Sequence, residues 1–363
     1  VANGALYDGT LINGWTVLYS EGITSFNQTR GFDMVTVAEP AAYETIASAC
    51  GSQMDYDAAA KYVAKNVKTV FTGTPGADVI LSNASEASTS AVNALLKAGK
   101  TVGMVTEGEY KGDFICSYAD FLTVKDAYLL TATGISGTVN AQVIAKSPTV
   151  YVPGETTENT SGFRYSNQVS SVANWNYDQA AMKLMNFDTT SDVTKADAVA
   201  GASALEADAK TAVQNGLPYI GYGSRATVDV VPGAKRTTLS GAMDCLTPVV
   251  YPNESLVNAS YIADNDGILY GYGLGYFSAI PETATVLVQS DPTRTPTEGF
   301  IPTNTEERAA AFEAYCNGGV QGFAYTEDGM DVVLFANSLT NKVQQRDDYA
   351  YISNFLFSTV LSE

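Results

Sequence analysis

Histidine is absent from the 363 residues of this chain. Ser–His–Asp triads and Cys–His dyads use a histidine side chain as the base that activates the nucleophile. Many hydrolytic zinc sites likewise bind the metal through histidine nitrogen atoms. The chain by itself therefore cannot form a histidine-dependent zinc hydrolase, a Ser–His–Asp triad or a Cys–His dyad.

Basic residues are scarce as well, with 20 lysines and arginines against 39 aspartates and glutamates, which gives a net charge of −19. Nucleic-acid backbones and anionic membrane surfaces both require clustered lysine and arginine side chains, whereas the bases of this chain are scattered singly. We therefore expect neither nucleic acid nor an anionic membrane surface as a partner.

Long apolar runs are missing too. A membrane-spanning helix needs about 20 consecutive apolar residues, and the longest candidate, residues 350–361, is interrupted by Ser353 and Asn354. We predict no membrane insertion and expect this stretch to be a terminal packing helix. The start of the sequence has neither a basic n-region nor an apolar h-region, so it contains no signal peptide. Either such a peptide was removed or the chain is a piece excised from a longer one.

The residues that are present indicate a folded protein. Apolar residues make up 45% of the chain and charged residues 16%, which argues against disorder, and the length suits two domains. An acidic, lysine-poor composition rich in Thr, Ser, Asn and Gly, with 22 tyrosines, is typical of exported bacterial surface proteins. We therefore expect an extracellular or cell-surface location in a bacterium.

Four cysteines, Cys50, Cys116, Cys245 and Cys316, lie far apart and form no C-x-x-C pair. They allow three disulfide pairings, among which the sequence does not choose. Because a chain of this size needs no covalent staples, we favour buried free thiols.

Two segments read as the same strand–helix–strand unit. In the first, a β-rich run from Asp78 precedes a helix over 85–97 that Gly99 ends, and an apolar strand follows over 101–106. In the second, 196–201 leads to a helix over 203–214, closed by Asn215-Gly216, and to a strand at 219–223. This order predicts βαβ units.

The remaining patterns complete the predicted fold. We expect strands at 15–19 and 149–153, a β-hairpin over 322–336, and helices at 55–66, 178–186, 303–316 (opened by a capping box from Thr303 to Glu306) and 348–361. Residues 153–173, rich in Gly, Thr, Ser and Asn, read as a long excursion. A boundary near Ser147-Pro148 then gives an α/β protein of two Rossmann- or flavodoxin-like halves in series, residues 1–147 and 148–363.

The first candidate site is Gly221-Tyr-Gly-Ser-Arg225, directly after a predicted buried strand. Open α/β sheets bind ligands at the carboxyl ends of their strands. A nucleophile elbow would place Ser or Cys at the centre of G-x-S-x-G or G-x-C-x-G, but here the centre is Gly223. Ser224 comes one residue late and has no histidine to activate it. A glycine-rich strand exit is the favoured interpretation.

Two further glycine-rich or acidic motifs are weak. Gly271-Tyr-Gly-Leu-Gly275 lacks the third glycine and the helix of a dinucleotide fingerprint. Asp264-Asn-Asp-Gly267 resembles the start of a calcium loop, but the following ligands are missing. We therefore expect a turn there and no cofactor, with a weak Ca²⁺ site at Asp264 and Asp266 as the alternative.

A pair of acidic residues and a run of aromatic residues leave two more kinds of site open. Glu107 and Glu109 follow a predicted strand, and alternate residues of an extended segment point the same way, so they could form the carboxylate pair of a glycosidase. With 39 acids in the chain, such a pair also arises by chance. The aromatic run Tyr270, Tyr272, Tyr276 and Phe277 could stack on sugars or peptides, although packing of the sheet edge is the favoured reading.

A family resemblance rests on several of these segments. They are Gly216-Leu-Pro-Tyr-Ile-Gly-Tyr-Gly, Asp266-Gly-Ile-Leu-Tyr-Gly-Tyr-Gly-Leu, Ala284-Thr-Val-Leu-Val-Gln-Ser, Asp331-Val-Val-Leu-Phe-Ala, the loop with Arg346, and residues 98–114 of the first half. The second half resembles the class I glutamine amidotransferase-like domain found C-terminal to the catalytic domain in many secreted bacterial zinc carboxypeptidases. The first half resembles the region between the two.

The resemblance implies a non-catalytic accessory region. The family's zinc ligands, a His-x-x-Glu pair and a distant His, are absent, and so is the Cys–His–Glu triad of the amidotransferases, with Gly223 at the matching position. The chain would then be part of a larger peptidase-like surface protein, in which it either positions peptide substrate next to a catalytic domain or attaches the enzyme to the cell surface. The alternative is an independent extracellular protein that binds sugars or peptides.

The two-half fold suggests one candidate site, a cleft between the halves, which the independent binding protein would use. If the strand ends of the two halves face one another, the loop with Glu107, Glu109 and Tyr110 lies near the strand exit with Tyr222, Ser224 and Arg225. Acids facing an arginine and tyrosines suit a peptide or a carbohydrate. A structural salt bridge is the plainer outcome.

Overall fold

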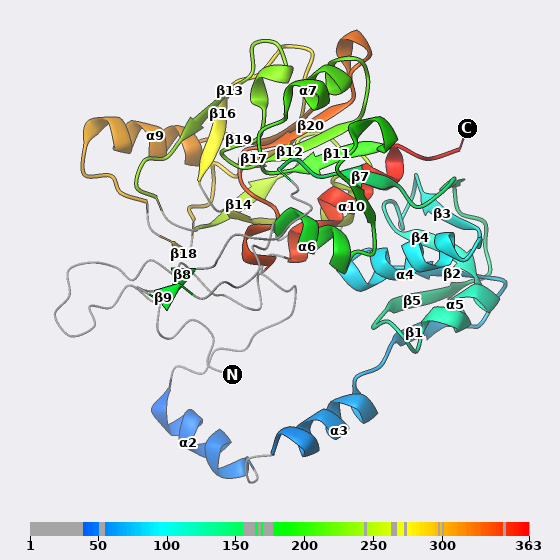
Figure 1. Ribbon diagram of the computed structural model, residues 1–363. Coiled ribbons are helices and arrows are strands. Elements are labelled where there is room, and N and C mark those ends of the chain that lie inside the picture. Colours follow the sequence, from blue (N-terminus) through cyan, green and yellow to red (C-terminus); the bar gives the residue numbers. More distant parts are fainter. Residues whose placement is uncertain are drawn as a thin grey trace.

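The computed structural model describes residues 39–50, 55–154, 164–165, 168–169, 177–242, 245–262, 267–271, 274–296, 298–299, 301–343 and 346–362 (Figure 1). These residues form two β-sheets in series with helices around them, which confirms the predicted α/β class. The strand expected at 15–19 lies outside the described residues, and so does most of 153–173, where only the small hairpin of β8 (Arg164–Tyr165) and β9 (Gln168–Val169) is described.

The first sheet has six strands in the order β1-β5-β2-β4-β3-β6. Their bounds are β1 Val70–Gly73, β2 Asp78–Leu81, β3 Val102–Val105, β4 Phe114–Ser117, β5 Thr131–Ile135 and β6 Ala141–Val143. The helices of this half are α4 (Glu86–Lys97) and α5 (Tyr118–Val124), and α2 (Pro40–Ala49) and α3 (Tyr56–Asn66) precede the sheet. Asp55 caps α3 as its side chain accepts the Ala58 N–H at 2.7 Å.

The unit β2-α4-β3 forms close to its predicted bounds, and Gly99 ends the helix with φ +72°. It differs from a simple βαβ unit in one respect: β4 lies between β2 and β3 and is antiparallel to both. The reason is the tight turn at 106–113, where the Gly112 N–H donates to the carbonyl of Val105 at 2.9 Å and sends the chain straight back along β3. The first sheet is therefore mixed, with a parallel pair only at β1 and β5.

The second sheet has twelve strands, and its main path runs β10-β7-β11-β12-β20-β19-β17-β14-β15. The bounds are β7 Thr149–Tyr151, β10 Asp188–Thr190, β11 Ala198–Gly201, β12 Tyr219–Tyr222, β13 Lys235–Thr238, β14 Cys245–Val250, β15 Ile268–Gly271, β16 Gly275–Ala279, β17 Thr285–Ser290, β18 Glu298–Gly299, β19 Val320–Tyr325 and β20 Val332–Phe335. Strands β10, β7, β11, β12 and β20 are parallel, and β19, β17, β14 and β15 continue antiparallel.

The helices of this half are α6 (Tyr177–Leu184), α7 (Ala207–Gln214), α8 (Ala259–Ile262), α9 (Glu306–Cys316) and α10 (Tyr349–Ser358). Helix α7 begins four residues later than predicted, after an extended segment in which Thr227 Oγ1 accepts the Leu205 N–H at 2.7 Å. Helix α9 is capped by Thr305 rather than Thr303, since its hydroxyl accepts the Arg308 N–H at 3.3 Å. The predicted hairpin is β19 and β20, paired antiparallel. Among the described helices, none is long and apolar enough to cross a membrane.

The central parallel strands β11, β12 and β20 bury both faces, as their apolar sequences predict. Alternate residues point to opposite faces, so Tyr219 packs with the core around α7, whereas Ile220 and Tyr222 pack with the core around α6 and α10. The second of these cores also contains Val79 and Phe114 of the first sheet. One hydrophobic core therefore includes strands of both sheets.

Helix α10 lies at the centre of this shared core, and every residue from Tyr349 to Phe357 is buried. Its Phe357 ring meets Phe114 of the first sheet at 5.2 Å between centroids and Phe187 of the second half at 5.3 Å. The change from one sheet to the other falls between β6 and β7, across the expected boundary at Ser147-Pro148. The assignment of residues 1–147 and 148–363 to separate domains stays a prediction.

A buried polar network accompanies these apolar contacts. The Asn83 amide donates to Asn354 Oδ1 at 2.8 Å and to Ser353 Oγ at 3.2 Å, and the Thr89 hydroxyl donates to Asn83 Oδ1 at 3.2 Å. The backbone N–H of Asn83 donates to Asp113 Oδ1 at 2.8 Å. Each side chain of this network thus has a partner, as buried polar groups require.

Asp113 is the one acid of this network, and burial raises the pKa of its carboxyl from 3.8 to about 6, although the Asn83 N–H opposes the rise. A folded-state pKa above the unfolded value gives stability at low pH that is lost as the pH rises through about 6. Asn in its place keeps the acceptor oxygen and carries no charge. Between pH 4 and pH 7.5 the wild type should lose this stability and Asp113→Asn should not. We therefore expect the unfolding free energy of Asp113→Asn, relative to that of wild type, to rise by about 2 kcal/mol over this range.

Urea denaturation at the two pH values measures this difference. Asp229→Asn is the matched control, because the Asp229 carboxylate is 73% exposed and its ion pair with Lys210 lies on the surface. A stability difference between Asp113→Asn and wild type that is the same at both pH values contradicts the prediction.

Candidate functional site

The carboxyl ends of the parallel strands form the candidate site. Strand β12 lies between β11 and β20, parallel to both, and all four of its residues are buried. Gly223 follows at once with φ +87°, and its N–H donates to the carbonyl of Phe335 at 3.1 Å. The predicted place of Gly223, at the turn that leaves a central parallel strand, is confirmed. Its role as a degenerate nucleophile position stays a prediction.

The turn at Gly223 keeps one property of a nucleophile elbow and lacks another. A positive φ is the strained conformation that such elbows use, and a Cβ added to Gly223 would meet Ser338 only at 3.4 Å, which is ordinary contact. The chain continues, however, into a three-residue 3₁₀ turn, η2 (Val228–Val230), and not into an α-helix. No helix N-terminus therefore stabilises negative charge directly behind this turn.

Tyr222, the last residue of β12, points into the protein. Its side chain is fully buried, and its hydroxyl donates to Asp178 Oδ1 at 3.0 Å. The Thr340 hydroxyl donates to the same oxygen at 2.6 Å, and the backbone N–H of Ala202 donates to Oδ2 at 2.8 Å. Asp178 thereby connects α6 with the ends of β11 and β12 and with the loop that follows β20. Burial raises the pKa of this carboxyl, and the three hydrogen bonds oppose part of the rise.

Arg236 of β13 is a second polar anchor at this edge. Its Nε donates to the carbonyl of Ala336, one residue past β20, at 2.6 Å, and Nη1 donates to Thr238 Oγ1 at 2.8 Å. Burial lowers the pKa of the guanidinium to about 10. Gly275 makes room for it, because a Cβ there would lie 2.5 Å from the guanidinium. Two cationic side chains thus lie near this edge: Arg225 follows the end of β12, and Arg236 reaches from β13 to the carbonyl just past β20.

The other predicted site residues lie on the surface. Ser224 and Arg225 are exposed, as are Glu107 and Glu109, while Tyr110 is half-buried. The segment 106–113 is a turn and not an extended strand, so alternation does not make Glu107 and Glu109 converge. Glu107 Oε2 instead accepts a hydrogen bond from the Asn140 amide at 2.8 Å.

The turn at 106–113 contacts the second half away from β12. Lys111 forms an ion pair with Glu254 at 2.8 Å, and Gly112 lies so near α8 that a Cβ would be 2.9 Å from Ala259. Within the described ranges, no hydrogen bond or ion pair joins this turn to residues 222–225. The shared cleft therefore stays a prediction for Glu107, Glu109, Tyr110, Tyr222, Ser224 and Arg225. Because the Tyr222 side chain is buried and bonded to Asp178, it would lie beneath such a cleft and would not line it.

The candidate Ca²⁺ site and the aromatic run lie only partly within the described residues. Asp264, Asp266 and Tyr272 lie outside the described residues, and the described part of the chain holds no group of three His, Cys, Asp or Glu placed to bind a metal. Tyr270 and Phe277 are buried, and Phe277 packs edge-to-face on Phe323 at 4.8 Å, which fits ordinary sheet packing.

None of the four cysteines forms a disulfide bond. Cys116 and Cys245 are buried, Cys316 is half-buried and Cys50 is exposed, so the expectation of burial fails at Cys50. Burial raises the pKa of the Cys116 thiol to about 12 and that of Cys316 to about 11, which keeps both protonated and unreactive near neutral pH.

Sequence reasoning missed the two anchors, Asp178 and Arg236. A signal existed for Asp178, since it opens a helix whose following residues are Gln-Ala-Ala-Met, and an acid in such a buried helix needs donors. For Arg236 there was none, because its position depends on Gly275 and Ala336, which are distant in the sequence.

Comparison with known proteins gives only weak likenesses. No family model matches the chain, and no curated protein matches it. Among solved structures, a protein described as part of a GMP synthase from Thermoplasma acidophilum is 12% identical, with a TM-score of 0.33, over 57% of this chain and 92% of its own. A cytoplasmic protein of Salmonella typhimurium LT2 is 12% identical, with a TM-score of 0.35, over 59% and 100%. A second cytoplasmic protein, from Salmonella typhimurium, is 9% identical, with a TM-score of 0.34, over 60% of this chain and 100% of its own. Likenesses this distant carry no argument about function.

The Asp178 network makes a prediction for Tyr222→Phe. Loss of one donor to a buried carboxyl raises its pKa further, so ionisation of the folded protein costs more free energy as the pH rises. We expect a loss of about 1–3 kcal/mol at pH 8 and a smaller loss at pH 5. Tyr151→Phe is the control, because the Tyr151 hydroxyl donates at 2.7 Å to Glu206, which is exposed. Urea denaturation measures the unfolding free energies. An equal loss of unfolding free energy in both variants, or a loss in Tyr222→Phe that is the same at pH 5 and pH 8, would contradict the role of Asp178.

Proposed function

We propose that this chain is a non-catalytic, amidotransferase-like accessory region of an exported zinc metallocarboxypeptidase-like surface protein of a bacterium. In this role it holds a peptide next to a catalytic domain of the same native chain. One observation carries the proposal: the sharp turn after the central strand β12 presents Gly223, which has no side chain, where an active relative would hold its nucleophile. Since the sequence has no histidine, no imidazole base can activate the neighbouring Ser224 either.

The exposed residues of the turn suit binding better than chemistry. Ser224 and Arg225 are exposed at the carboxyl edge of the parallel strands, the usual ligand position in open α/β sheets. An exposed guanidinium in a chain of net charge −19 attracts anionic groups, and it pairs with a carboxylate through two parallel hydrogen bonds. A peptide with a free C-terminal carboxylate is therefore the ligand we propose, with Arg225 as its anchor.

The rigid surroundings of the turn support the same role. The buried Asp178–Tyr222–Thr340 contacts and the Arg236–Ala336 hydrogen bond fix the ends of β12 and β20 behind it. A binding group that is held in place before the ligand arrives loses less entropy on binding. The acidic turn with Glu107 and Glu109 would complete the site if it reaches the ligand from the first half.

Titration calorimetry with three probes tests the proposal: a short peptide acid, the same peptide as its C-terminal amide, and an oligosaccharide. We expect the acid to bind about tenfold more tightly than the amide, and Arg225→Ala to abolish this difference. Lys195→Ala is the matched control, because Lys195 is an exposed base in η1 (Val193–Lys195), just before β11 and hence at the opposite edge of the sheet.

Two outcomes contradict the proposal. One is tighter binding of the oligosaccharide than of either peptide, which favours the independent sugar-binding protein. The other is turnover of C-terminal amino-acid, ester or glutamine substrates, with or without Zn²⁺, that a single substitution in this chain abolishes. The native reading frame distinguishes the accessory region from an independent peptide-binding protein, because only the first requires an upstream domain that carries a His-x-x-Glu motif.

A further inference from the structure

The first sheet ends at an open edge. Strand β1 is the last in the strand order and pairs with no described strand except β5 (Figure 1). The Val70 N–H points to the β5 side, because it donates to the carbonyl of Leu130 at 2.8 Å. Successive residues of a strand turn their backbone groups to alternate sides, so the N–H and C=O of Phe71 point outward. Such an edge is a template for one more strand.

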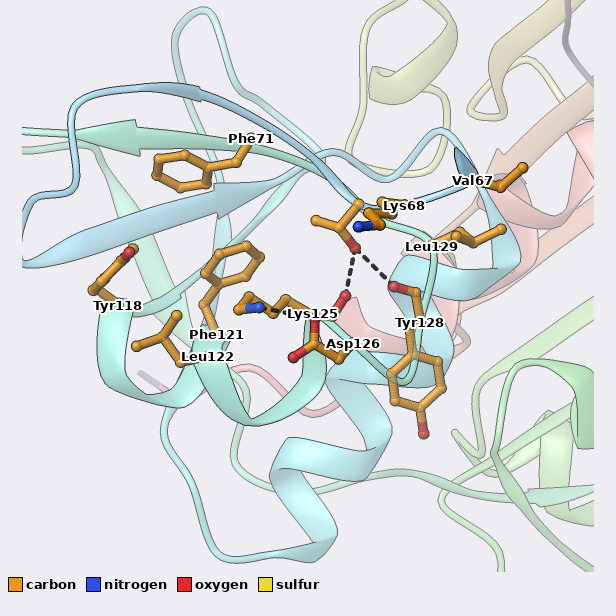
Figure 2. Close-up of a pocket in the computed structure, with 11 residues that line it drawn as sticks. Val67, Lys68, Phe71, Tyr118, Phe121, Leu122, Lys125, Asp126, Tyr128 and Leu129 are labelled. Atoms are coloured by element: carbon orange, nitrogen blue, oxygen red, sulfur yellow. Dashed lines mark hydrogen bonds and ion pairs between the residues drawn. The ribbon is translucent and has the colours of Figure 1, made fainter. Parts of the chain in front are cut away.

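A recess with a volume of about 450 Å³ lies beside this edge, between β1 and α5 (Figure 2). The rings of Phe71 and Phe121 stack in it with their centroids 5.4 Å apart. The Thr69 hydroxyl lies 2.7 Å from the carbonyl oxygen of Lys125 and 2.8 Å from that of Tyr128, which ties the beginning of β1 to the end of α5. The walls of the recess are therefore held in place before any ligand binds.

Three large apolar side chains that line the recess remain exposed to solvent. Val67 is 46% exposed, Leu122 43% and Leu129 56%. Single apolar residues on a surface are normal, whereas a contiguous group around a recess marks a binding site. The recess has room for one or two apolar side chains and not for a folded domain, so its occupant is a short segment of chain.

The recess also carries a positive charge that is available to a ligand. Lys125 forms an ion pair with Asp126 at 2.8 Å, whereas exposed Lys68 forms no ion pair with any described residue. These three side chains give the recess a net charge of +1 in a chain whose net charge is −19. An anionic group on the ligand therefore finds its partner in Lys68, just before β1.

The position of Lys68 determines the direction of an added strand. An antiparallel strand runs opposite to β1, so its C-terminal end lies at the beginning of β1, next to Lys68. A parallel strand would instead leave its C-terminal carboxylate beyond Gly73, where the sequence continues Thr74-Pro-Gly-Ala77 without a base. Antiparallel pairing is also slightly more stable per residue than parallel pairing. The charge and the edge together favour an antiparallel strand that ends in a free carboxylate.

We propose that the C-terminal end of an extended peptide pairs antiparallel with β1 and places its free carboxylate at Lys68. The peptide residue opposite Phe71 exchanges both backbone hydrogen bonds with it, and its side chain points to the same face, into the recess. The residue two places further on, opposite Thr69, faces the recess as well and is the last one. The ligand is thus a peptide whose last and third-from-last side chains are apolar. This site lies on the first sheet and is separate from the turn at Gly223.

Titration calorimetry with related peptides tests the pairing. The reference is a short N-acetylated peptide acid with leucine at its last and third-from-last positions and threonine between them. We expect its C-terminal amide to bind about fivefold more weakly, because the charge at Lys68 loses its partner. N-methylation of the third-from-last residue removes the hydrogen bond to the Phe71 carbonyl and should weaken binding about tenfold. N-methylation of the penultimate residue, whose N–H points away from β1, is the matched control and should change little.

Every titration uses the whole chain with Arg225→Ala, so the result does not depend on whether the turn at Gly223 binds peptides. Adding Lys68→Gln should abolish the difference between acid and amide, and adding Leu122→Asp should weaken both about tenfold. Lys195→Gln, in the second half, and Val143→Asp, 46% exposed in β6 at the opposite edge of the first sheet, are the matched controls.

Three results overturn the proposal. The first is equal affinity of the acid and the amide. The second is equal affinity of the two N-methylated peptides, which would show that apolar side chains bind without strand pairing. The third is a difference between acid and amide that Lys68→Gln leaves unchanged. The comparison of peptides leaves the protein itself unaltered, so it decides the matter even if a variant fails to fold.

Discussion

The burial of the last helix, α10, between the two sheets is the constraint on which the rest of the structure depends. A helix that is apolar on one side only can lie on a surface, but α10 is buried all round, so its polar side chains must find partners inside the protein. Ser353 and Asn354 find one in Asn83, 270 and 271 positions earlier in the chain. An unpaired amide at this depth would cost about 1–3 kcal/mol. The first sheet is therefore held in place by residues at the end of the chain.

The same helix determines how rigid the candidate site is. Tyr351 of α10 packs on Phe335 at 4.8 Å, and Phe335 pairs with Tyr222 across β20 and β12. Tyr222 in turn donates to Asp178, and Gly223 follows it. The turn at Gly223 is thus fixed by a continuous set of buried contacts that begins at α10. Such a site favours a ligand that is held in one position, which is what the proposed accessory role requires.

Local patterns predicted the elements of this fold better than their arrangement. Helix α4 and strand β12 lie where capping residues, glycine stops and apolar runs indicate them, and the hairpin of β19 and β20 follows from its turn. Strand β4 escaped prediction because Phe114-Ile-Cys-Ser117 is too short for a pattern, and only the turn before it places it between β2 and β3. For the candidate site, the position of Gly223 was predictable because it depends on neighbours in the sequence. Asp178 and Arg236 belong to the site through contacts with residues far along the chain, which no local pattern records.

Native-state hydrogen exchange in increasing urea tests the central claim, that both sheets share one core around α10. If they do, the slowest amides of β3 in the first sheet, of β20 in the second and of α10 itself exchange only through one common opening, and their free energies converge on a single value as urea rises. Amides of β3 that exchange through a separate opening several kcal/mol lower, while those of α10 and β20 stay protected, would show that the first sheet unfolds independently and would contradict the account.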